Sequence, residues 1–192
     1  MQTTTASSSS TAPVESPISN WVIDTAHSEV GFRVRHMMVS WTKGRFEKYE
    51  GALELNEQDL SKSKLSVSID ANSINTGTTD RDNHLRSADF FDVANFPSLA
   101  FVSQKFEPGK DGAFRVLGEL TIRGVTKAVA LDVEEFSAAH KDPWGNLKRG
   151  ARAHAKLNRK DFGLNWNAAI EMGGVVVGDS VEITLEVELT KK

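Results

Sequence analysis

The sequence VEITLEVEL, residues 181–189, alternates apolar and polar residues at every position. Successive side chains of a β-strand point to opposite faces, so a period of two is typical of a strand with one dry and one wet face. The apolar face here carries Val, Ile and Leu, and the polar face carries three Glu residues and one Thr. The stretch therefore predicts a strand of a half-buried sheet, and it is the clearest of several.

Seven other stretches repeat this pattern, which predicts about eight strands in all. They cover residues 30–34, 53–55, 65–71, 114–122, 129–133 and 151–157, with a weaker series at 99–101. Short turn-like segments at residues 108–112, 124–127 and 143–146 separate some of them. Parallel strands need crossover connections of about a dozen residues or more, so these short gaps predict antiparallel pairing. A closed barrel and a two-sheet sandwich both satisfy the pattern.

One segment departs from the period of two. Residues 78–91 are polar and charged, and Thr79 is followed by Asp82 three positions later, a spacing typical of a helix start. We predict a short helix over residues 80–87, inserted between two strands. Such a helix either covers the opening of a barrel or plugs one of its ends.

The composition describes one ordinary globular domain preceded by a tail. The chain has 192 residues, a net charge of −3, no run of basic residues and no Cys, so its composition gives no electrostatic signature of nucleic-acid binding and excludes disulfides. Ten of the first twenty residues are Ser or Thr, so we expect a disordered tail over residues 1–19 and a domain over residues 20–192. No secretory signal and no long apolar run is present, which predicts a cytoplasmic protein without stable membrane insertion.

Small residues on the predicted inner faces suggest a cavity. Ala151, Ala153 and Ala155 share one face of a strand, and Gly118 interrupts another. An eight-stranded barrel can hold one small ligand, but the ten Phe residues could equally fill the space. An apolar chain in such a cavity would gain about 0.8 kcal/mol for each buried CH₂.

Nothing in the sequence indicates catalysis, a metal or a cofactor. The five His residues lack the close spacing of a local metal motif, and no nucleophile elbow or nucleotide-binding Gly loop is present. We therefore predict a protein that is not an enzyme. A hydrolase or isomerase of low activity, using His36 or His84 beside a carboxylate, is the alternative.

Two polar clusters lie beside aromatic residues. The first, residues 81–89, precedes Phe90 and Phe91, and the second is the run RKDFG at residues 159–163. A polar rim next to aromatic rings suits the head group of an amphiphile at the mouth of a barrel. A salt-bridged helix tethered to the core would give the same pattern.

These clusters also carry a family resemblance. The chain resembles the YceI-like family, also called the polyisoprenoid-binding family, over roughly residues 20–190. The matching motifs, in order, are DTAHS (24–28), GRF (44–46), SINT (73–76), RDNHLRS (81–87), DFFD (89–92), FP (96–97), GELTIRGVT (118–126) and RKDFG (159–163). Many relatives begin with a signal peptide, which the Ser/Thr-rich start of this chain does not resemble.

The resemblance implies an extended, lipocalin-like, eight-stranded antiparallel β-barrel with a short helix near its opening. It also implies an elongated apolar pocket for an isoprenoid tail, of the polyprenyl quinone or prenyl phenol type; a fatty acid or fatty amide is the alternative ligand. The expected tail contacts are Phe32, His36, Phe46, Val67, Ile69, Phe101, Leu120, Ile122, Ala153 and Ala155. The expected head-group contacts are Arg81, Asp82, His84, Arg159 and Asp161. Two candidate surface residues, Trp41 and Trp144, leave a homodimer open.

Overall fold

The computed structural model describes residues 17–169 and 175–192 of the chain. Its strands are β1 (Ile18–His36), β2 (Ser40–Phe46), β3 (Tyr49–Asn56), β4 (Lys64–Asp70), β5 (Ile74–Asn75), β6 (Ser98–Pro108), β7 (Phe114–Ile122), β8 (Val125–Phe136), β9 (His140–Lys141), β10 (Leu147–Asn158) and β11 (Val177–Lys191). The helices are α1 (Thr79–Arg86) and the 3-10 turns η1 (Leu60–Lys62), η2 (Ala71–Ser73) and η3 (Arg159–Phe162).

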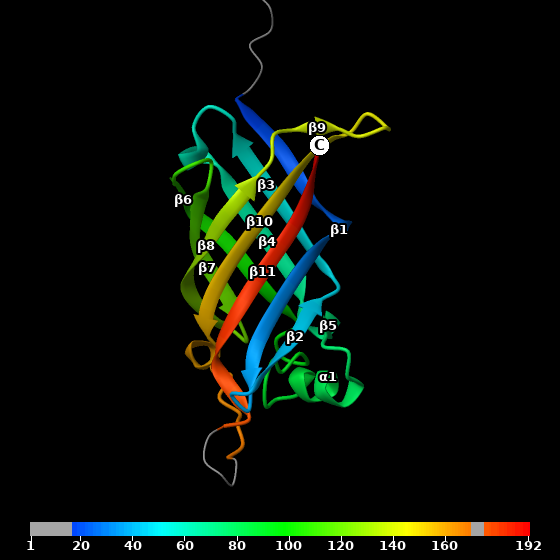
Figure 1. Ribbon diagram of the computed structural model, residues 1–192, viewed down its shortest axis with the longest axis vertical. Helices are drawn as coiled ribbons and strands as arrows, with labels where there is room; N and C mark the ends of the chain where they lie inside the picture. The colour runs from blue at the N-terminus through cyan, green and yellow to red at the C-terminus, as the bar shows by residue number, and fades with distance from the viewer. Residues whose placement is uncertain (1–16, 170–174) are drawn as a thin grey trace, which may run out of the picture.

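Eight of the strands close into one antiparallel barrel (Figure 1). Their order around the wall is β1, β3, β4, β6, β7, β8, β10 and β11, and β11 returns to pair with β1. The closing ladder runs from Trp21 opposite Lys191 to His36 opposite Val177. The predicted eight-stranded barrel is therefore confirmed, and the sandwich alternative is wrong, because the two sheets of a sandwich would each have unpaired edge strands, whereas here β11 pairs with β1.

The long strand β1 changes partners along its length. Its first residues, from Ile18 to Val22, pair with β3, whereas the part from Val30 to His36 pairs with β2. A register shift between Asp24 and Glu29 marks an irregularity where the change occurs. Such a bulge bends a strand and turns it toward a new neighbour. The strand β2 thereby extends the barrel wall at one end, where it also pairs with β5.

The two ends of the barrel differ (Figure 1). We call the end with the helix the α1 end; it also holds the turns after β1 and β7 and the connection from β10 to β11. The other, the β9 end, holds the turns after β3 and β6 and the β9–β10 hairpin. Both chain ends of the described residues also lie at the β9 end.

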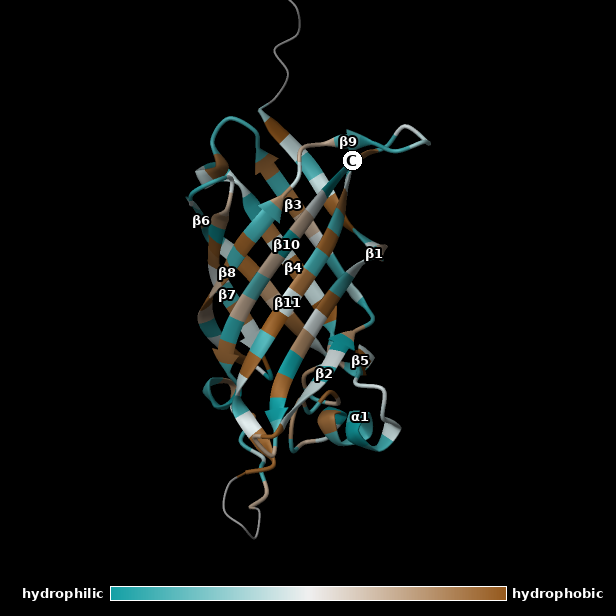
Figure 2. Ribbon diagram, in the orientation of Figure 1, coloured by the Kyte–Doolittle hydropathy of each residue, from teal (hydrophilic) through white to brown (hydrophobic). Residues whose placement is uncertain are grey.

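Apolar residues alternate with polar ones along the strands, as Figure 2 shows. In β7, Val116, Leu120 and Ile122 are buried, whereas Arg115 and Glu119 are exposed. Each strand therefore turns one face toward a common apolar interior and the other toward solvent. The sequence pattern predicted this division correctly.

The turn between β7 and β8 is shorter than the sequence suggested. We predicted a connection over residues 124–127, but β8 already begins at Val125, which pairs with Ile122. The turn consists of Arg123 and Gly124, with φ of 49° and 72°. Two residues with positive φ form the tight hairpin turn that matches the twist of paired strands.

The helix α1 begins at Thr79, one residue before the predicted start. The expected cap is wrong, because the N-cap is Thr78 and its side chain caps nothing. Instead the buried Asp82 carboxylate accepts from the N–H and the hydroxyl of Thr76, at 2.9 and 2.5 Å. This eight-residue helix is the only α-helix within the described residues, and none of their helices is long and apolar enough to cross a bilayer.

The predicted tail over residues 1–19 lies mostly outside the described residues. Within it, Ile18 and Ser19 already belong to β1, so the barrel begins two residues before the predicted boundary at residue 20. The cause is Trp21, which is buried and whose Nε1 donates to the Ser19 hydroxyl at 2.8 Å. The Ser19 hydroxyl in turn donates to Glu57 at 2.8 Å, which fixes this start against the β3–β4 connection.

Candidate ligand-binding site

The interior of the barrel contains a cavity of about 180 Å³. Strands β1, β3, β4, β6, β7, β8, β10 and β11 and the end of β2 all contribute to its wall. Every lining residue is apolar or Gly, so no ionisable side chain among the described residues borders it. A site of this kind can bury hydrocarbon but offers no side chain for acid–base chemistry or metal binding.

Three aromatic rings line the cavity at the β9 end. Phe114 stacks on Phe106 at a centroid distance of 6.1 Å and meets Phe136 edge-on at 5.6 Å. All three rings line the cavity. The lining of the cavity at the β9 end is thus aromatic and apolar.

A second aromatic group lies at the α1 end. Phe46 contacts Phe32 at 5.8 Å and Phe91 edge-on at 5.8 Å. Phe32 and Phe46 line the cavity, and Phe91 belongs to the segment that follows α1. The helix segment therefore covers this end of the barrel through Phe91, consistent with the predicted helix near the opening.

Small residues in the wall leave less room than the sequence suggested. Ala151 and Ala153 do border the cavity. The expected gap at Gly118 is wrong, because a Cβ there would come within 2.5 Å of the Phe101 ring. Likewise a Cβ at Gly44 would lie 2.4 Å from the Phe32 ring. These Gly residues admit Phe rings to the interior rather than opening volume for a ligand.

Eight of the ten expected tail contacts line the cavity. They are Phe32, Phe46, Val67, Ile69, Phe101, Leu120, Ile122 and Ala153. His36 and Ala155 do not line it. His36 lies on the same face of β1 as Phe32, four residues further on, but it is the last residue of the strand and lies beyond the cavity. Ala155 is buried nearer to the α1 end of β10 than Ala153 is.

Two aromatic lining residues, Phe106 and Phe136, lie outside all of the apolar series that the sequence predicted. Both follow a register shift, between Ser103 and Lys105 in β6 and beside Ala153 where β8 meets β10. An extra residue in a strand reverses which parity faces inward. A strict period of two counted from Phe101 therefore places Phe106 outside, and only an allowance for bulges would recover it.

Arg81 and Asp82, expected at a head group, both bind the loop before α1. Arg81 donates through Nε to the Thr76 hydroxyl at 2.7 Å and through Nη2 to the Thr76 carbonyl at 2.8 Å. Asp82 accepts from the same Thr76. In the structure these two side chains hold the start of α1 through hydrogen bonds to Thr76.

His84, a residue of α1, belongs to a cluster of aromatic rings. Its ring meets Phe90 at 5.1 Å and Trp166 at 4.6 Å, edge-on in both cases. Its Nε2 is 2.8 Å from the Asp89 carboxylate. Because Trp166 comes from the connection between β10 and β11, these contacts tie α1 to that connection.

Arg159 is buried beneath the β10–β11 connection. Its guanidinium donates to the backbone carbonyls of Gly178, Leu164, Trp166 and Val177, and it lies 3.6 Å from the Asp179 carboxylate. Burial lowers its pKa below the ordinary value. Asp161, in contrast, is exposed in η3. The five expected head-group residues thus do not converge on one polar rim in this structure.

A charged cluster lies on the outside of the barrel, at the bulge of β1. The Lys148 ammonium is 2.6 Å from Asp24 and 3.0 Å from Glu188. Its hydrogen bond to Asp24, helped by His27, lowers the pKa of that carboxyl to about 2, and the two carboxylates raise the pKa of Lys148. Asp24, His27 and Glu188 could together ligate a cation, but the ammonium already occupies the space between the carboxylates.

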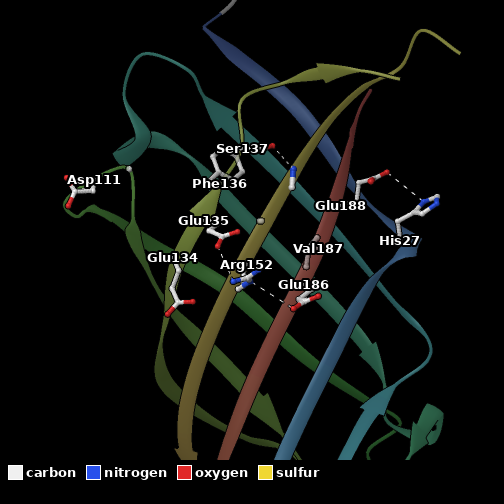
Figure 3. Close-up of a pocket in the computed structure, with 13 residues that line it drawn as sticks. His27, Asp111, Glu134, Glu135, Phe136, Ser137, Arg152, Glu186, Val187 and Glu188 are labelled. Carbon is white, nitrogen blue, oxygen red and sulfur yellow. Dashed lines mark hydrogen bonds and ion pairs between the residues drawn. The ribbon is translucent and has the colours of Figure 1, made fainter. Parts of the chain in front are cut away.

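An open groove of about 610 Å³ crosses the outer faces of β8, β10 and β11 near this cluster. Figure 3 shows Arg152 in it, between Glu135 and Glu186. These side chains are exposed, and their mutual ion pairs lie in water, where such pairs contribute little. The groove carries charged side chains on the outer surface, and it shares Phe136, Ala151 and Val187 with the lining of the internal cavity.

The fold and the site together define a closed, lipocalin-type β-barrel with an apolar interior. Residues 21–189 match the YceI-like domain, and the chain belongs to that family. UPF0312 protein SAS2572 of Staphylococcus aureus (strain MSSA476) is 37% identical over 174 residues, which cover 90% of this chain and 98% of that protein. This confirms the family that the sequence motifs indicated.

Solved structures show the same fold. A YCEI protein of Campylobacter jejuni is 32% identical, covers 88% of this chain and 96% of its own, and superposes with a TM-score of 0.70. A polyisoprenoid binding domain from Saccharophagus degradans is 17% identical, covers 90% of this chain and 98% of its own, and has a TM-score of 0.65. The second likeness, at this identity, concerns the fold alone.

Proposed function

We propose that the barrel binds the hydrocarbon tail of an isoprenoid lipid and thereby sequesters or carries that lipid. The observation that carries the proposal is the lining of the internal cavity, which is apolar over its whole surface. A polar atom of a ligand would find no hydrogen-bonding side chain in this cavity, so the bound part of the ligand should be hydrocarbon.

Burial of hydrocarbon supplies the binding energy in this proposal. A five-carbon isoprene unit gains about 4 kcal/mol gross at about 0.8 kcal/mol for each buried carbon, less the cost of ordering the ligand. Since no lining residue is polar, the head group remains at an end of the cavity. We favour the α1 end, because α1 and η3, whose sequences are rich in charged residues, both lie at that end of the barrel.

The choice of an isoprenoid rests on the family and its fold. YceI-like barrels include a domain described as polyisoprenoid binding, whose fold this chain shares. A polyprenyl quinone or prenyl phenol is therefore the first ligand class to test. Fatty acids and fatty amides are the second, because an apolar lining accepts any flexible hydrocarbon of suitable width.

We propose binding without catalysis and without a cofactor. The acidic and basic residues with shifted pKa values that lie closest together, Asp24 and Lys148, are on the outer surface and not in the cavity. A hydrolase needs a base and a nucleophile beside the bound substrate. In the described residues, the cavity presents neither.

Native mass spectrometry of the purified protein, followed by extraction and identification of lipids, tests the proposal. We expect a bound isoprenoid lipid, or saturable binding of an added polyprenyl quinone to delipidated protein. Oleic acid and oleamide serve as competitors, and they should displace the quinone weakly. Absence of both a copurifying lipid and any polyprenyl binding would overturn the proposal, and stronger binding of oleate would replace the isoprenoid with a fatty acid.

A further inference from the structure

The turn between β1 and β2 exposes three apolar side chains in succession. Met37, Met38 and Val39 have 41%, 61% and 79% of their surface accessible. Val175, 38% accessible, lies beside them, because the Met37 N–H donates to the carbonyl of the next residue, Val176, at 2.9 Å. Scattered single apolar residues on a surface are ordinary, but a contiguous patch indicates an interaction site.

The other large apolar residues exposed in the described part of the chain are separated from one another in sequence. They are Ile18, Val102 and Trp144. The apolar tip of Met37, Met38 and Val39 is therefore distinctive among the described surface residues. It lies at the α1 end of the barrel (Figure 1).

The backbone of this tip does not favour the residues that occupy it. Met37 and Met38 have φ of 49° and 60°, and the Val39 N–H donates to the His36 carbonyl at 3.1 Å. Met37 and Met38 are the central residues of a β-turn from His36 to Val39, and positive φ at both central positions favours Asn followed by Gly. The two Met side chains are thus held in an unfavourable conformation while contributing little to the core, which points to a contact outside the molecule.

The same hairpin is positively charged. Residues 30–46 contain Arg33, Arg35, Lys43 and Arg45 and no acidic residue. The register places Arg33 opposite Lys43 and Arg35 opposite Trp41, so all of these side chains share the outer face. The guanidinium groups of Arg33 and Arg35 lie 4.5 and 4.2 Å from the centre of the Trp41 ring.

Two acidic residues neutralise part of this charge. Glu182 pairs with Arg33 at 2.6 Å, and Glu47 pairs with Arg45 at 3.4 Å. Arg35 and Lys43 form no ion pair with a carboxylate among the residues that the structure describes. Their charges remain available to an anionic partner.

We propose that the β1–β2 hairpin docks reversibly on the surface of a bilayer that contains anionic phospholipid. Met37, Met38 and Val39 enter the boundary between head groups and acyl chains, and Trp41 lies at the level of the head groups. Arg35 and Lys43 attract the lipid phosphates. This one hairpin combines an apolar tip, an aromatic ring and two cations without ion pairs. Together these features favour binding to an anionic membrane surface.

Docking would also orient the cavity, a consequence that rests on the proposed function. The inner face of the same hairpin carries Phe32 and Phe46, which line the cavity at the α1 end. A protein held by the apolar tip therefore directs that end of the barrel toward the bilayer. A lipid tail would then pass between bilayer and cavity over a short path.

Flotation with lipid vesicles tests the docking without any isoprenoid. The vesicles consist of phosphatidylcholine alone or of equal parts of phosphatidylcholine and phosphatidylglycerol. We expect the native chain to bind the anionic vesicles and to be released by high salt. The double variant Met37→Asn/Met38→Gly removes the apolar side chains and supplies the residues that the turn favours. The double variant should bind the anionic vesicles at least about tenfold more weakly, because it lacks the CH₂ and CH₃ groups that the two Met side chains would bury in the bilayer.

Two single variants separate charge from apolar contact. Lys43→Gln should weaken binding to anionic vesicles about fivefold, since one cation near such a surface contributes about 1 kcal/mol. It should leave binding to neutral vesicles unchanged. Trp144→Ser is the matched control, because it removes an exposed apolar residue at the β9 end and should bind vesicles like the native chain.

The thermal melting temperature distinguishes docking from folding. Met37→Asn/Met38→Gly should melt no lower than the native chain, since it relieves the turn, and should bind a polyprenyl quinone equally well in vesicle-free solution. Failure of the native chain to bind anionic vesicles, or undiminished binding by the double variant, would overturn the proposal. A native dimer on size-exclusion chromatography that the double variant dissociates, without vesicle binding, would also overturn it and assign the tip to contact between copies. A chain that docks but binds no polyprenyl quinone would leave the docking intact and contradict only the proposed function.

Discussion

Replacement of Ala153 by Trp places an indole in the cavity of the barrel. Ala153 lines the cavity on β10, opposite Val133 on β8 and Leu185 on β11. Its Cβ points inward, so the larger side chain extends into the space that the proposed lipid tail occupies. The barrel interior contains about 180 Å³ of free volume, which the indole can take up in part without displacing the wall.

The expected loss follows from the hydrocarbon that the indole displaces. An indole covers roughly the space of one isoprene unit, whose five carbons gain about 4 kcal/mol gross on burial. Ordering of the tail offsets about half of this, which leaves about 2 kcal/mol, or a Kd raised about 30-fold. Overpacking would cost the fold about 1–3 kcal/mol where the ring meets the opposite wall.

Fluorescence titration with a polyprenyl quinone measures this loss, and urea unfolding measures the stability. His154→Trp is the matched control, because His154 is the next residue of β10, faces solvent and adds the same side chain outside the barrel. We expect His154→Trp to bind the quinone with native affinity. An Ala153→Trp protein that is folded and binds the quinone with unchanged Kd would show that the tail does not lie beside β10, and would refute the placement of the ligand in this cavity.

Three further changes address the fold. Gly118→Ala should lower the free energy of unfolding by about 1–3 kcal/mol in urea, because the new methyl group meets a phenyl ring 2.5 Å away; Gly150→Ala, whose methyl group would have its nearest neighbour at 3.9 Å, should change it far less. The pKa of Asp24 is lowered from 3.8 to about 2, so its ionised form stabilises the fold above pH 3.8, and that stability is lost as the pH falls through about 2. Lys148→Met should therefore flatten the dependence of the melting temperature on pH in this range, and an unchanged dependence would contradict the ion pair. Arg159→Met should cost about 3 kcal/mol in urea unfolding, since it leaves several buried carbonyls without a donor, and a loss below about 1 kcal/mol would show that they find other partners.

The period of two located most of the barrel because each strand is half buried. All eight predicted series fall in strands of the barrel wall, except that Ala71, the last residue of one series, belongs to η2; VEITLEVEL forms the middle of β11. The strands that the sequence analysis missed are β2, β5 and β9. The sequence of β2, SWTKGRF, has polar residues on both faces, because the strand lies at the end of the barrel where one face borders the loop around Thr76.

The residues that line the cavity could be predicted only where inner and outer positions alternate strictly along a strand. Val67, Ile69, Leu120 and Ile122 keep the alternation and were placed correctly on the inner face. Residues after a bulge were not, because one extra residue in a strand reverses the inner and outer faces without leaving a sign in the local sequence. The polar residues of α1 were ambiguous, since a head-group ligand and a backbone carbonyl both require the same charged side chains.

The antiparallel strands with one apolar face and the membership of the YceI-like family can both be recognised in the order of residues along the chain. Both properties are local, because they depend on which residues follow one another. The tertiary structure alone decided that β11 pairs with β1 to close the barrel, and that Phe rings enter the interior over Gly118 and Gly44. It also placed the backbone of Met37 beside that of Val176, two segments that are far apart in the chain. These outcomes depend on contacts between residues distant in the chain, which no period in the sequence records.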